Sequence, residues 1–315
     1  MVAKGPAAEE LAARARALLG VEVRNVRRLS AGASRAMWAV DAVGDDGSLR
    51  PLIVRTDPRG ENRPTGPVPE SALLRAAAEA GVPVPEVVAE DDEHLVVERI
   101  EGETIPRKIL RDKEYASALP RLAAQCGEAL AAIHSIPVGE VAGLDSDVDP
   151  VVTWRVMLDG FGQPHPTFEL ALRWLDERRP PTTGATIVHG DFRNGNLIVG
   201  PDGLRAVLDW ELAHVGDPME DLGWLCVKAW RFGVDRPVGG FGDRTDLYAA
   251  YERASGQPVD ADVVRWWEIL GTLKWGVMCM AQAFTHLSGT VRSVELATIG
   301  RRVCENEWDL LELIG

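Results

Sequence analysis

The sequence predicts an α+β fold with two lobes: a small N-terminal lobe built on an antiparallel sheet and a larger, mainly helical C-terminal lobe. Two observations lead to this prediction. Short runs rich in β-branched residues alternate with Gly- and Pro-containing turns before residue 100, whereas helical periodicity dominates after residue 102. At 315 residues, the chain is also long enough for two lobes with a substantial core. We therefore expect the lobes to span residues 1–101 and residues 102–315.

The N-terminal lobe is expected to contain five strands with one internal helix, preceded by a short Ala-rich helix that ends at Gly20. The pair Asp46-Gly47 lies between two apolar runs and indicates a hairpin. Pro83 and Pro85 end the internal helix, because proline cannot continue it. The predicted helices cover residues 9–19 and 70–80, the predicted strands residues 21–29, 35–43, 49–55, 87–90 and 94–99, and the intervening turn and loop residues 30–34 and 57–69.

The C-terminal lobe shows helical spacing over most of its length. One helix is predicted because apolar residues fall at i, i+3, i+7, i+11 and i+14. These residues are Leu119, Leu122, Cys126, Leu130 and Ile133. Short strands are predicted at residues 187–189, 196–199 and 204–208. From Asp217 onward helices dominate, and Asp217-Pro218 resembles a helix start with a capping acid and a proline in the first turn.

The composition is that of an ordinary soluble globular protein, with 46% hydrophobic and 26% charged residues. The formal net charge is −14, from 34 basic and 48 acidic residues. Nucleic-acid binding needs clustered Lys and Arg opposite the phosphates, so this balance argues against nucleic acid as a partner. It favours a cationic small molecule only weakly, because an acidic solvated surface has the same composition.

No segment of the sequence is typical of a membrane span or a secretion signal. Charged residues interrupt the first twenty positions, and Lys274, Gln282 and His286 interrupt the most apolar stretch, residues 270–287. We expect that stretch to be a buried helix. The cysteines are widely spaced and form no C-x-x-C pair, so we expect reduced, buried thiols in a cytosolic protein. They are Cys126, Cys226, Cys279 and Cys304.

The most informative motif is the segment His189-Gly-Asp-Phe-Arg-Asn-Gly-Asn196, followed thirteen positions later by Asp209. A carboxylate at Asp191 can receive a proton from a hydroxyl group. The amide oxygen of Asn196 and the carboxylate of Asp209 are oxygen ligands suited to Mg²⁺. Together they supply the parts that phosphoryl transfer from a nucleotide requires.

With Gly at its second position, this H-x-D-x-x-x-x-N spacing resembles the catalytic loop of the aminoglycoside phosphotransferase and choline kinase superfamily. The resemblance extends, with weaker motifs, from about Leu29 to Leu222. It implies a two-lobed protein-kinase-like fold, ATP or GTP as donor, Mg²⁺ as cofactor, and a small-molecule hydroxyl as acceptor. It also implies that Asp221, of the G-D-P-x-x-D-L segment, bonds the backbone of the catalytic loop, and that His189 is a structural hydrogen-bonding residue of the loop. We expect His134 to be a hydrogen-bonded core histidine packed under the loop.

The resemblance places a nucleotide site in the N-terminal lobe. Ser30, Gly32 and Ser34 correspond to the phosphate loop of the family, where small residues let backbone N–H groups approach phosphate. The segment that contains Glu98 and Ile100 resembles the hinge between the lobes, where their backbone groups would meet the adenine edge.

Arg55 stands where most relatives place lysine, and would hold the α- and β-phosphates with Glu70 as its ionic partner. The change is a real departure, because the arginine fork is longer and planar. Arg193 is a candidate for stabilising the transferring phosphoryl group, and the alternative is an exposed arginine paired with a neighbouring acid. In having arginine at both positions, the sequence resembles the subgroup of the family that is fused to, or encoded beside, acyl-CoA dehydrogenases.

Two acceptor classes stay open. The net charge favours an aminoglycoside or similar cationic antibiotic, with Glu211 and Asp159 as possible contacts, whereas the subgroup resemblance favours a hydroxyacyl thioester or related metabolite. Tryptophans of the C-terminal lobe could line an acceptor pocket, but core packing is the expected role for most of them. They are Trp154, Trp224, Trp230, Trp266, Trp267 and Trp275.

A different class of function is a nucleotide-binding pseudokinase without catalysis, which only Arg55 supports. A protein kinase is a poorer interpretation, because Asp217 follows Asp209 by only eight positions and leaves no room for a long activation loop. The oligomeric state stays open. The sequence also lacks the G-x-x-x-x-G-K-[ST], H-E-x-x-H and G-x-S-x-G motifs, which excludes the commonest P-loop, zinc-protease and serine-hydrolase signatures.

Overall fold

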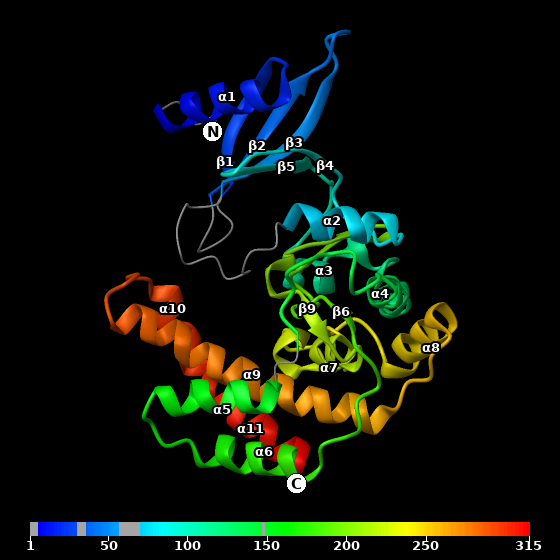
Figure 1. Cartoon of the computed structure of the whole chain (residues 1–315), viewed down its shortest axis with the longest axis vertical. Helices are drawn as coiled ribbons and strands as arrows, with labels where there is room; N and C mark the ends of the chain where they lie inside the picture. Colours follow the sequence, from blue (N-terminus) through cyan, green and yellow to red (C-terminus); the bar gives the residue numbers. More distant parts are fainter. Residues whose placement is uncertain (1–5, 30–35, 57–69, 147–148) are drawn as a thin grey trace.

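The computed structural model describes residues 6–29, 36–56, 70–146 and 149–315. It has the predicted α+β architecture, with an antiparallel five-stranded sheet at the N-terminal end and a mainly helical remainder (Figure 1). The strands lie in the order β1-β2-β3-β5-β4. Their bounds are β1 (Val23–Leu29), β2 (Ala36–Val43), β3 (Leu49–Thr56), β4 (Val87–Glu90) and β5 (His94–Glu98).

Every helix and strand predicted for the N-terminal lobe is present, with small differences at the ends. The hairpin between β2 and β3 pairs Val43 with Leu49. The Gly47 N–H donates to the Gly44 carbonyl at 2.9 Å, and Gly47 has a φ of 80°, which glycine adopts without strain. The predicted turn at residues 30–34 and the loop at residues 57–69 lie outside the described residues.

The two faces of the sheet pack against different parts of the molecule. Helix α1 (Pro6–Leu19) covers one face, where Leu11, Trp38 and Val96 belong to one apolar cluster. The neighbours of Val96 on β5, Leu95 and Val97, point to the opposite face because side chains alternate along a strand. They join the cluster that includes α2 (Glu70–Glu79) and the core of the helical lobe.

The C-terminal lobe is built from helices and two small antiparallel ribbons, β6 with β9 and β7 with β8. Its elements are α3 (Pro106–Arg111), η1 (Lys113–Tyr115), α4 (Leu119–His134), α5 (Pro150–Gly160), α6 (Pro166–Glu177), β6 (Thr186–Val188), β7 (Leu197–Gly200), β8 (Gly203–Val207), η2 (Trp210–Leu212), β9 (His214–Gly216), α7 (Met219–Cys226), η3 (Lys228–Arg231), α8 (Arg244–Ser255), α9 (Ala261–Leu287), α10 (Val294–Ile299), η4 (Gly300–Arg302) and α11 (Val303–Ile314).

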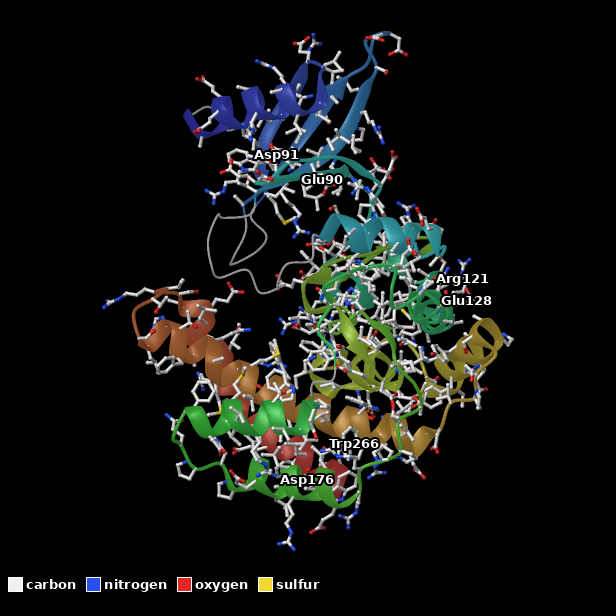
Figure 2. All side chains as sticks on the ribbon, in the orientation of Figure 1. Glu90, Asp91, Arg121, Glu128, Asp176 and Trp266 are labelled. Carbon is white, nitrogen blue, oxygen red and sulfur yellow. The ribbon has the colours of Figure 1, made fainter. Side chains whose placement is uncertain are left out.

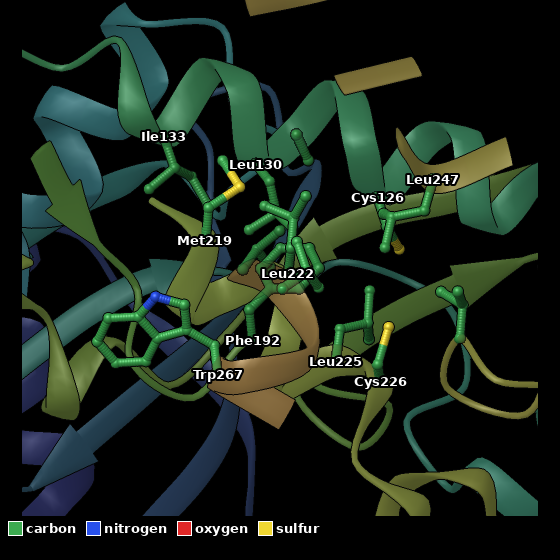
Figure 3. Packing of buried hydrophobic residues seen from close by; sticks show 14 of the residues in the cluster. Cys126, Leu130, Ile133, Phe192, Met219, Leu222, Leu225, Cys226, Leu247 and Trp267 are labelled. Atoms are coloured by element: carbon green, nitrogen blue, oxygen red, sulfur yellow. The ribbon is translucent and has the colours of Figure 1, made fainter. Parts of the chain in front are cut away.

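Helix α4 is buried on the face that its periodicity predicts, with Leu119 at the margin (Figure 3). Its close contact with α8 depends on Gly127, where a Cβ atom would lie 2.5 Å from the carbonyl oxygen of Leu247. Figure 3 shows Leu130 and Ile133 of α4 beside Met219 and Leu222 of α7. This packing places α7 under the segment between β6 and β7.

Helix α9 runs through the helical lobe and is buried along most of its length. The prediction of a buried helix over residues 270–287 is wrong at the C-terminal end, where Phe284 is 59% and Leu287 77% exposed. Apolar periodicity does not reveal where the neighbouring helices stop covering a long helix. Within the described residues, no helix is both long and apolar enough to cross a bilayer.

Three of the four cysteines are buried as predicted, but Cys304 is exposed. It lies on the outward side of α11, and its thiol donates to the carbonyl of Arg301 at 3.1 Å. The tryptophans act mostly as core residues, with Trp154 only partly buried. Trp266, for example, is buried and donates its indole N–H to the carbonyl of Leu175 at 3.1 Å (Figure 2).

The backbone between β5 and α3 joins the sheet to the helical lobe. Glu103 and Val199 exchange backbone hydrogen bonds of 2.9 and 3.0 Å. Gly102 has a φ of 154°, and a Cβ atom there would lie 2.5 Å from the Ile198 side chain. Only glycine allows this close approach without displacement. We propose that the boundary between the two lobes lies near Glu101-Gly102.

Candidate active site

The catalytic-loop motif forms the irregular segment between β6 and β7. Gly190 has a φ of 75°, and a Cβ atom at this residue would lie 2.3 Å from the carbonyl oxygen of Leu212. The backbone therefore turns sharply against η2, and a larger residue would force the two segments apart. This turn places Asp191, which is 8% exposed, immediately after the buried strand.

The carboxylate of Asp191 accepts hydrogen bonds from three side chains. Arg193 Nε lies 3.0 Å from Oδ1 and 3.2 Å from Oδ2. Asn196 Nδ2 lies 2.6 Å from Oδ2, and Trp224 Nε1 lies 2.9 Å from Oδ1. The sequence-predicted residues Asp191, Arg193 and Asn196 are thus in direct contact, and the orientation of the carboxylate is strongly constrained.

Asn196 directs its amide nitrogen to Asp191, where it also bonds the backbone carbonyl at 3.0 Å. Its amide oxygen is therefore the atom available for a cation. The carbonyl of Asn196 accepts the N–H of Leu208 at 2.8 Å. This bond places Asn196 beside the end of β8, directly before Asp209.

Asp209 has a left-handed backbone, with φ and ψ both 66°, which re-aims its side chain after the strand. Burial raises the pKa of Asp209 to about 6, and the negative charges of Glu211, Asp191 and Glu70 raise it further against the opposing effect of Arg55. Carboxylates crowded in this way are the environment in which a divalent cation gains most from binding.

The chemistry of these donors fits Mg²⁺. Among the described residues, no group of three or more His, Cys, Asp or Glu side chains could hold a metal ion by itself. Mg²⁺ in nucleotide enzymes is commonly held by one or two protein oxygens, with the remaining positions filled by phosphate and water. The Asn196 amide oxygen and the Asp209 carboxylate match that pattern.

A buried network holds the loop from below. Both oxygens of Asp221 accept backbone N–H groups, from His189 at 2.7 Å and from Gly190 at 2.9 Å. His134 Nε2 lies 3.2 Å from Asp221, and its Nδ1 lies 2.9 Å from the Tyr251 hydroxyl. Burial raises the pKa of Asp221, but His134 and the N–H donors outweigh it and hold the pKa below its ordinary value. The predicted contacts of Asp221 and His134 are confirmed.

His189 is not a free base. Burial lowers the pKa of His189, so the neutral ring is favoured. Its Nε2 faces the Leu208 carbonyl at 3.0 Å, and its Nδ1 accepts the N–H of Asp191 at 3.2 Å. Both ring nitrogens are therefore occupied, and the histidine orients the residue that follows the turn.

Arg193 is partly buried and does not extend into solvent. Its guanidinium carbon lies 4.6 Å from the ring centre of Trp230, and its Nε bonds Asp191. In this conformation the arginine pairs with the neighbouring acid, which is the alternative that the sequence left open. Its two terminal nitrogens retain donors that could bind an anion.

Arg55 on β3 forms a two-point ion pair with Glu70 at the start of α2. The nitrogen–oxygen distances are 2.5 and 2.6 Å, and the side chains are 14% and 8% exposed. The contact predicted between these residues is therefore present. Glu70 also contributes to the raised pKa of Asp209, so the pair lies close to the proposed metal ligands.

The hinge residues differ in how their backbone groups are used. The Glu98 N–H donates to the carbonyl of Glu86 at 2.9 Å within the sheet, so it is committed to the fold. The Ile100 N–H has no hydrogen-bond acceptor among the described residues. Ser30, Gly32 and Ser34, the expected phosphate loop, lie outside the described residues.

The sequence did not identify Lys274 as part of this region. Its ammonium group donates to the Gly190 carbonyl at 2.9 Å, lies 3.5 Å from Glu220, and is 4.5 Å from the ring centre of Trp224. One feature of the sequence indicated its role: Lys274 is a charged residue inside the most apolar stretch of the chain. For Trp224, the sequence suggested core packing or a pocket wall, but not a contact with Asp191.

The segment that precedes α7 supports the same region. The helix begins at Met219, two residues after the predicted cap, yet Asp217 still accepts the N–H of Met219 at 2.9 Å. Glu220 lies 3.2 Å from His214. Burial raises the pKa of Glu220, but His214 and Lys274 outweigh it and lower the pKa below its usual value. Its carboxylate is thus committed to His214 and Lys274.

Of the acidic residues suggested for a cationic acceptor, Glu211 lies beside a proposed metal ligand. It follows Asp209 on η2 and contributes to the raised pKa of Asp209. Asp159 is exposed near the C-terminal end of α5.

Comparison with known proteins assigns this geometry to a family. Residues 25–267 match the model described as the phosphotransferase enzyme family. Among curated proteins, the chain is 32% identical over 196 residues to mouse (Mus musculus) acyl-CoA dehydrogenase family member 10. That match covers 56% of this chain and 18% of the relative. Member 11 from Gallus gallus is 28% identical over 222 residues, covering 64% of this chain and 27% of the relative. The chain thus spans about a quarter or less of these relatives.

Solved structures show the same fold. A putative aminoglycoside phosphotransferase from Ralstonia eutropha has a TM-score of 0.74 and 21% identity, with 97% of each chain covered. A thermostable mutant of the aminoglycoside phosphotransferase APH(4)-Ia, in a ternary complex with AMP-PNP and hygromycin B, has a TM-score of 0.65 and 16% identity. That match covers 96% of this chain and 98% of the other. The predicted two-lobed, kinase-like fold is therefore confirmed.

Proposed function

Since the chain belongs to the phosphotransferase enzyme family, we propose that it transfers the γ-phosphoryl group of ATP to a hydroxyl group of a small molecule. The family and the fold support phosphotransferase activity on a small molecule. The complex of APH(4)-Ia with AMP-PNP supports ATP as the donor, and GTP is the alternative. Because ATP is available inside cells, we place this activity in the cytoplasm.

One observation carries the proposal: Asn196 contacts Asp191 and, through its backbone, the residue before Asp209. Asn196 bonds the Asp191 carboxylate at 2.6 Å, and its carbonyl bonds Leu208. This arrangement supports a proton acceptor at Asp191 with metal-binding oxygens nearby. Phosphoryl transfer depends mainly on such positioning and on charge stabilisation.

In this proposal Asp191 accepts or orients the proton of the attacking hydroxyl group. The Asn196 amide oxygen and the Asp209 carboxylate hold Mg²⁺, which would neutralise charge on the phosphates when bound. A carboxylate suits the proton-accepting role because positive character develops on the attacking oxygen as its bond to phosphorus forms. The bond from Asn196 keeps Asp191 close to the metal-binding oxygens.

Two arginines would bind the phosphates of the nucleotide. Arg55 is fixed by Glu70 and would bind the α- and β-phosphates. Arg193 would turn its terminal nitrogens toward the transferring phosphoryl group, which weakens its Nε contact with Asp191. The N–H of Ile100, which bonds no acceptor in the described part of the chain, would meet the adenine edge together with the carbonyl of Glu98. Ser30, Gly32 and Ser34 would complete the phosphate contacts.

For the acceptor, we favour a hydroxylated metabolite such as a hydroxyacyl thioester over an aminoglycoside. The relatives named acyl-CoA dehydrogenase family members 10 and 11 support this choice. Arg193 places one cation beside Asp191, whereas Lys274 and Glu220 are already paired with each other. The terminal nitrogens of Arg193 suit an acceptor with a negative charge better than a polycationic antibiotic.

A second candidate is a pseudokinase that binds nucleotide without turnover. Arg55 in place of the usual lysine is the observation that favours it, because a planar guanidinium cannot reproduce the contacts of an ammonium group. Against it, the chain carries Asp191, Asn196 and Asp209, and Asn196 bonds both Asp191 and the residue before Asp209. The two candidates differ in one measurable property, which is turnover in the presence of an acceptor.

The test is a coupled ADP-release assay with Mg·ATP and a panel of acceptors: aminoglycosides, choline, hydroxy acids and hydroxyacyl-CoA thioesters. We expect stimulation by one acceptor class, with loss of about 100-fold or more in the Asp191→Ala and Asp209→Ala variants. Asp235→Ala, an exposed acid, is the matched control. Binding of Mg·ATP with no turnover for any acceptor would favour the pseudokinase, and antibiotic resistance of a host expressing the chain would favour the aminoglycoside.

A further inference from the structure

Of the three side chains that donate to the Asp191 carboxylate within the described part of the chain, one comes from outside the catalytic loop. Arg193 and Asn196 belong to the loop and have roles toward phosphate and Mg²⁺ in the proposed function. The third donor is the indole N–H of Trp224 in α7, whose Nε1 lies 2.9 Å from Oδ1 of Asp191. We infer that Trp224 is a positioning residue that fixes the orientation of the proposed base, an inference that rests on the proposed function.

The indole ring of Trp224 is held so that its N–H has a defined direction. The residue is 2% exposed and packs against the ring of Trp230, with 5.1 Å between the ring centres. On α9, Gly271 leaves space for the ring, because a Cβ atom there would lie 3.0 Å from it. A buried aromatic ring held from two sides loses little further freedom when it donates a hydrogen bond.

Lys274 connects this ring to the backbone of the catalytic loop. Its ammonium group lies 4.5 Å from the ring centre of Trp224 and donates to the carbonyl of Gly190 at 2.9 Å. A cation over the ring face attracts the π electrons and makes the indole N–H a stronger donor. One ammonium group thus anchors both the residue that precedes Asp191 and the ring that bonds its carboxylate.

The indole N–H of Trp224 is a neutral donor that has no role toward phosphate, unlike the guanidinium of Arg193. When Arg193 turns toward the transferring phosphoryl group its contact with the carboxylate weakens, whereas the indole has no reason to move. With Trp224 on Oδ1 and Asn196 on Oδ2, the plane of the carboxylate stays fixed after that rotation. Each oxygen then keeps a lone pair for the acceptor hydroxyl, and the carboxylate keeps its negative charge.

The chain offers a matched control in the same aromatic cluster. Trp275 is 8% exposed and contacts Trp230, but its indole nitrogen is buried with no hydrogen-bond partner among the described residues. The change Trp275→Phe therefore removes an N–H that bonds nothing there. The change Trp224→Phe removes the bond to Asp191 and a similar amount of packing, so the difference between the two variants isolates the hydrogen bond.

The first measurement is the indole N–H resonance of Trp224 in the full chain labelled with [¹⁵N]tryptophan, assigned by its loss in Trp224→Phe. We expect this resonance to shift and to exchange faster with solvent in Asp191→Ala, and to keep its protection in Arg193→Met. The Trp275 resonance should not change. If Asp191→Ala leaves the Trp224 resonance and its exchange rate unchanged, the inference is wrong. This readout requires no turnover.

The second measurement is turnover with the acceptor found by the panel. We expect Trp224→Phe to lower kcat by about 10–100-fold with KM for Mg·ATP within about 2-fold of wild type, because a bond to a charged group is lost at the chemical step. Trp275→Phe should stay within about 3-fold of wild type, and equal kcat values for the two variants would overturn the inference. Failure of the proposed function would instead appear as no turnover by the wild type.

Discussion

The carboxylate of Asp221 accepts the backbone N–H of His189 at 2.7 Å, although 32 positions separate the two residues. Its second oxygen accepts the N–H of Gly190 at 2.9 Å, and the side chain is fully buried. A charged acceptor with two backbone donors fixes the start of the catalytic loop before any ligand arrives. Asp221 therefore supports the site without touching a reacting atom.

Replacing Asp221 by Ala should be strongly destabilising. The change leaves two buried N–H groups and His134 without their acceptor, which costs about 3–5 kcal/mol of unfolding free energy. We expect urea unfolding to show this loss, together with loss of turnover. Asp235→Ala, at an exposed position, should change the unfolding free energy by about 0.5 kcal/mol or less. Equal effects for the two variants would contradict the assigned role.

The change Gly190→Ala should separate the catalytic loop from η2. Gly190 has a φ of 75°, and the new methyl group would lie 2.3 Å from the carbonyl oxygen of Leu212. We expect a loss of about 2–4 kcal/mol in unfolding free energy, from backbone strain and displacement of the contact. In Gly160→Ala, nothing lies within 4 Å of the new Cβ atom, so thermal unfolding should be unchanged or slightly raised.

The variant Asp209→Asn should be more stable than the wild type but less active. In the wild type, the Asp209 carboxylate is buried near Glu211, Asp191 and Glu70, and its pKa therefore rises to about 6. An amide removes that repulsion and suits the left-handed backbone, which Asn tolerates well. We expect the metal-free protein to gain about 1 kcal/mol at neutral pH, and turnover to fall by about 100-fold or more. Full Mg²⁺-dependent turnover would contradict the metal role.

The ion pair of Arg55 and Glu70 offers a test of nucleotide binding. We expect Arg55→Met to weaken Mg·ATP binding by about 10–100-fold, because a charge-assisted contact is lost. Arg55→Lys keeps the charge but loses the two-point contact, so the loss should be about 10-fold or less. Isothermal titration calorimetry measures both. Arg50→Met is the control, since Arg50 is an exposed residue of the same strand paired with Glu86. An unchanged Kd in Arg55→Met would exclude the phosphate role.

Asp91 should make the N-terminal lobe sensitive to acid. Burial raises the pKa of Asp91, but the N–H groups of Glu93 and His94 and the His94 ring outweigh it and lower the pKa to about 2. The stabilisation is therefore present above the ordinary pKa near 3.8 and is lost as the pH falls toward 2. It amounts to about 2 kcal/mol.

Urea unfolding of the wild type and of Asp91→Asn checks this expectation. The difference in unfolding free energy between them should be largest at neutral pH and should shrink as the pH falls from about 4 toward 2. Asp45→Asn, an exposed change in the hairpin of the same lobe, serves as the control. A difference that stays constant down to pH 2 would show that Asp91 keeps the same protonation in folded and unfolded chains.

Much of the fold follows from local patterns. The Asp46-Gly47 turn predicted the β2–β3 hairpin, and the apolar spacing of α4 predicted its buried face. These features depend on backbone preferences and on periodicity, which neighbours in sequence determine. The exposed end of α9 and the exposed Cys304 were missed, because burial depends on elements that pack from elsewhere in the chain.

The sequence by itself determined the order of the elements and the chemistry available at the site: a carboxylate, an amide and a second carboxylate at the spacing of a catalytic loop. The tertiary structure alone decided which side chains surround that carboxylate. Trp224 and Lys274, on α7 and α9, reach Asp191 and Gly190 because helix packing brings these distant segments together. Such contacts arise from the summed packing of the whole core, and no local pattern records them.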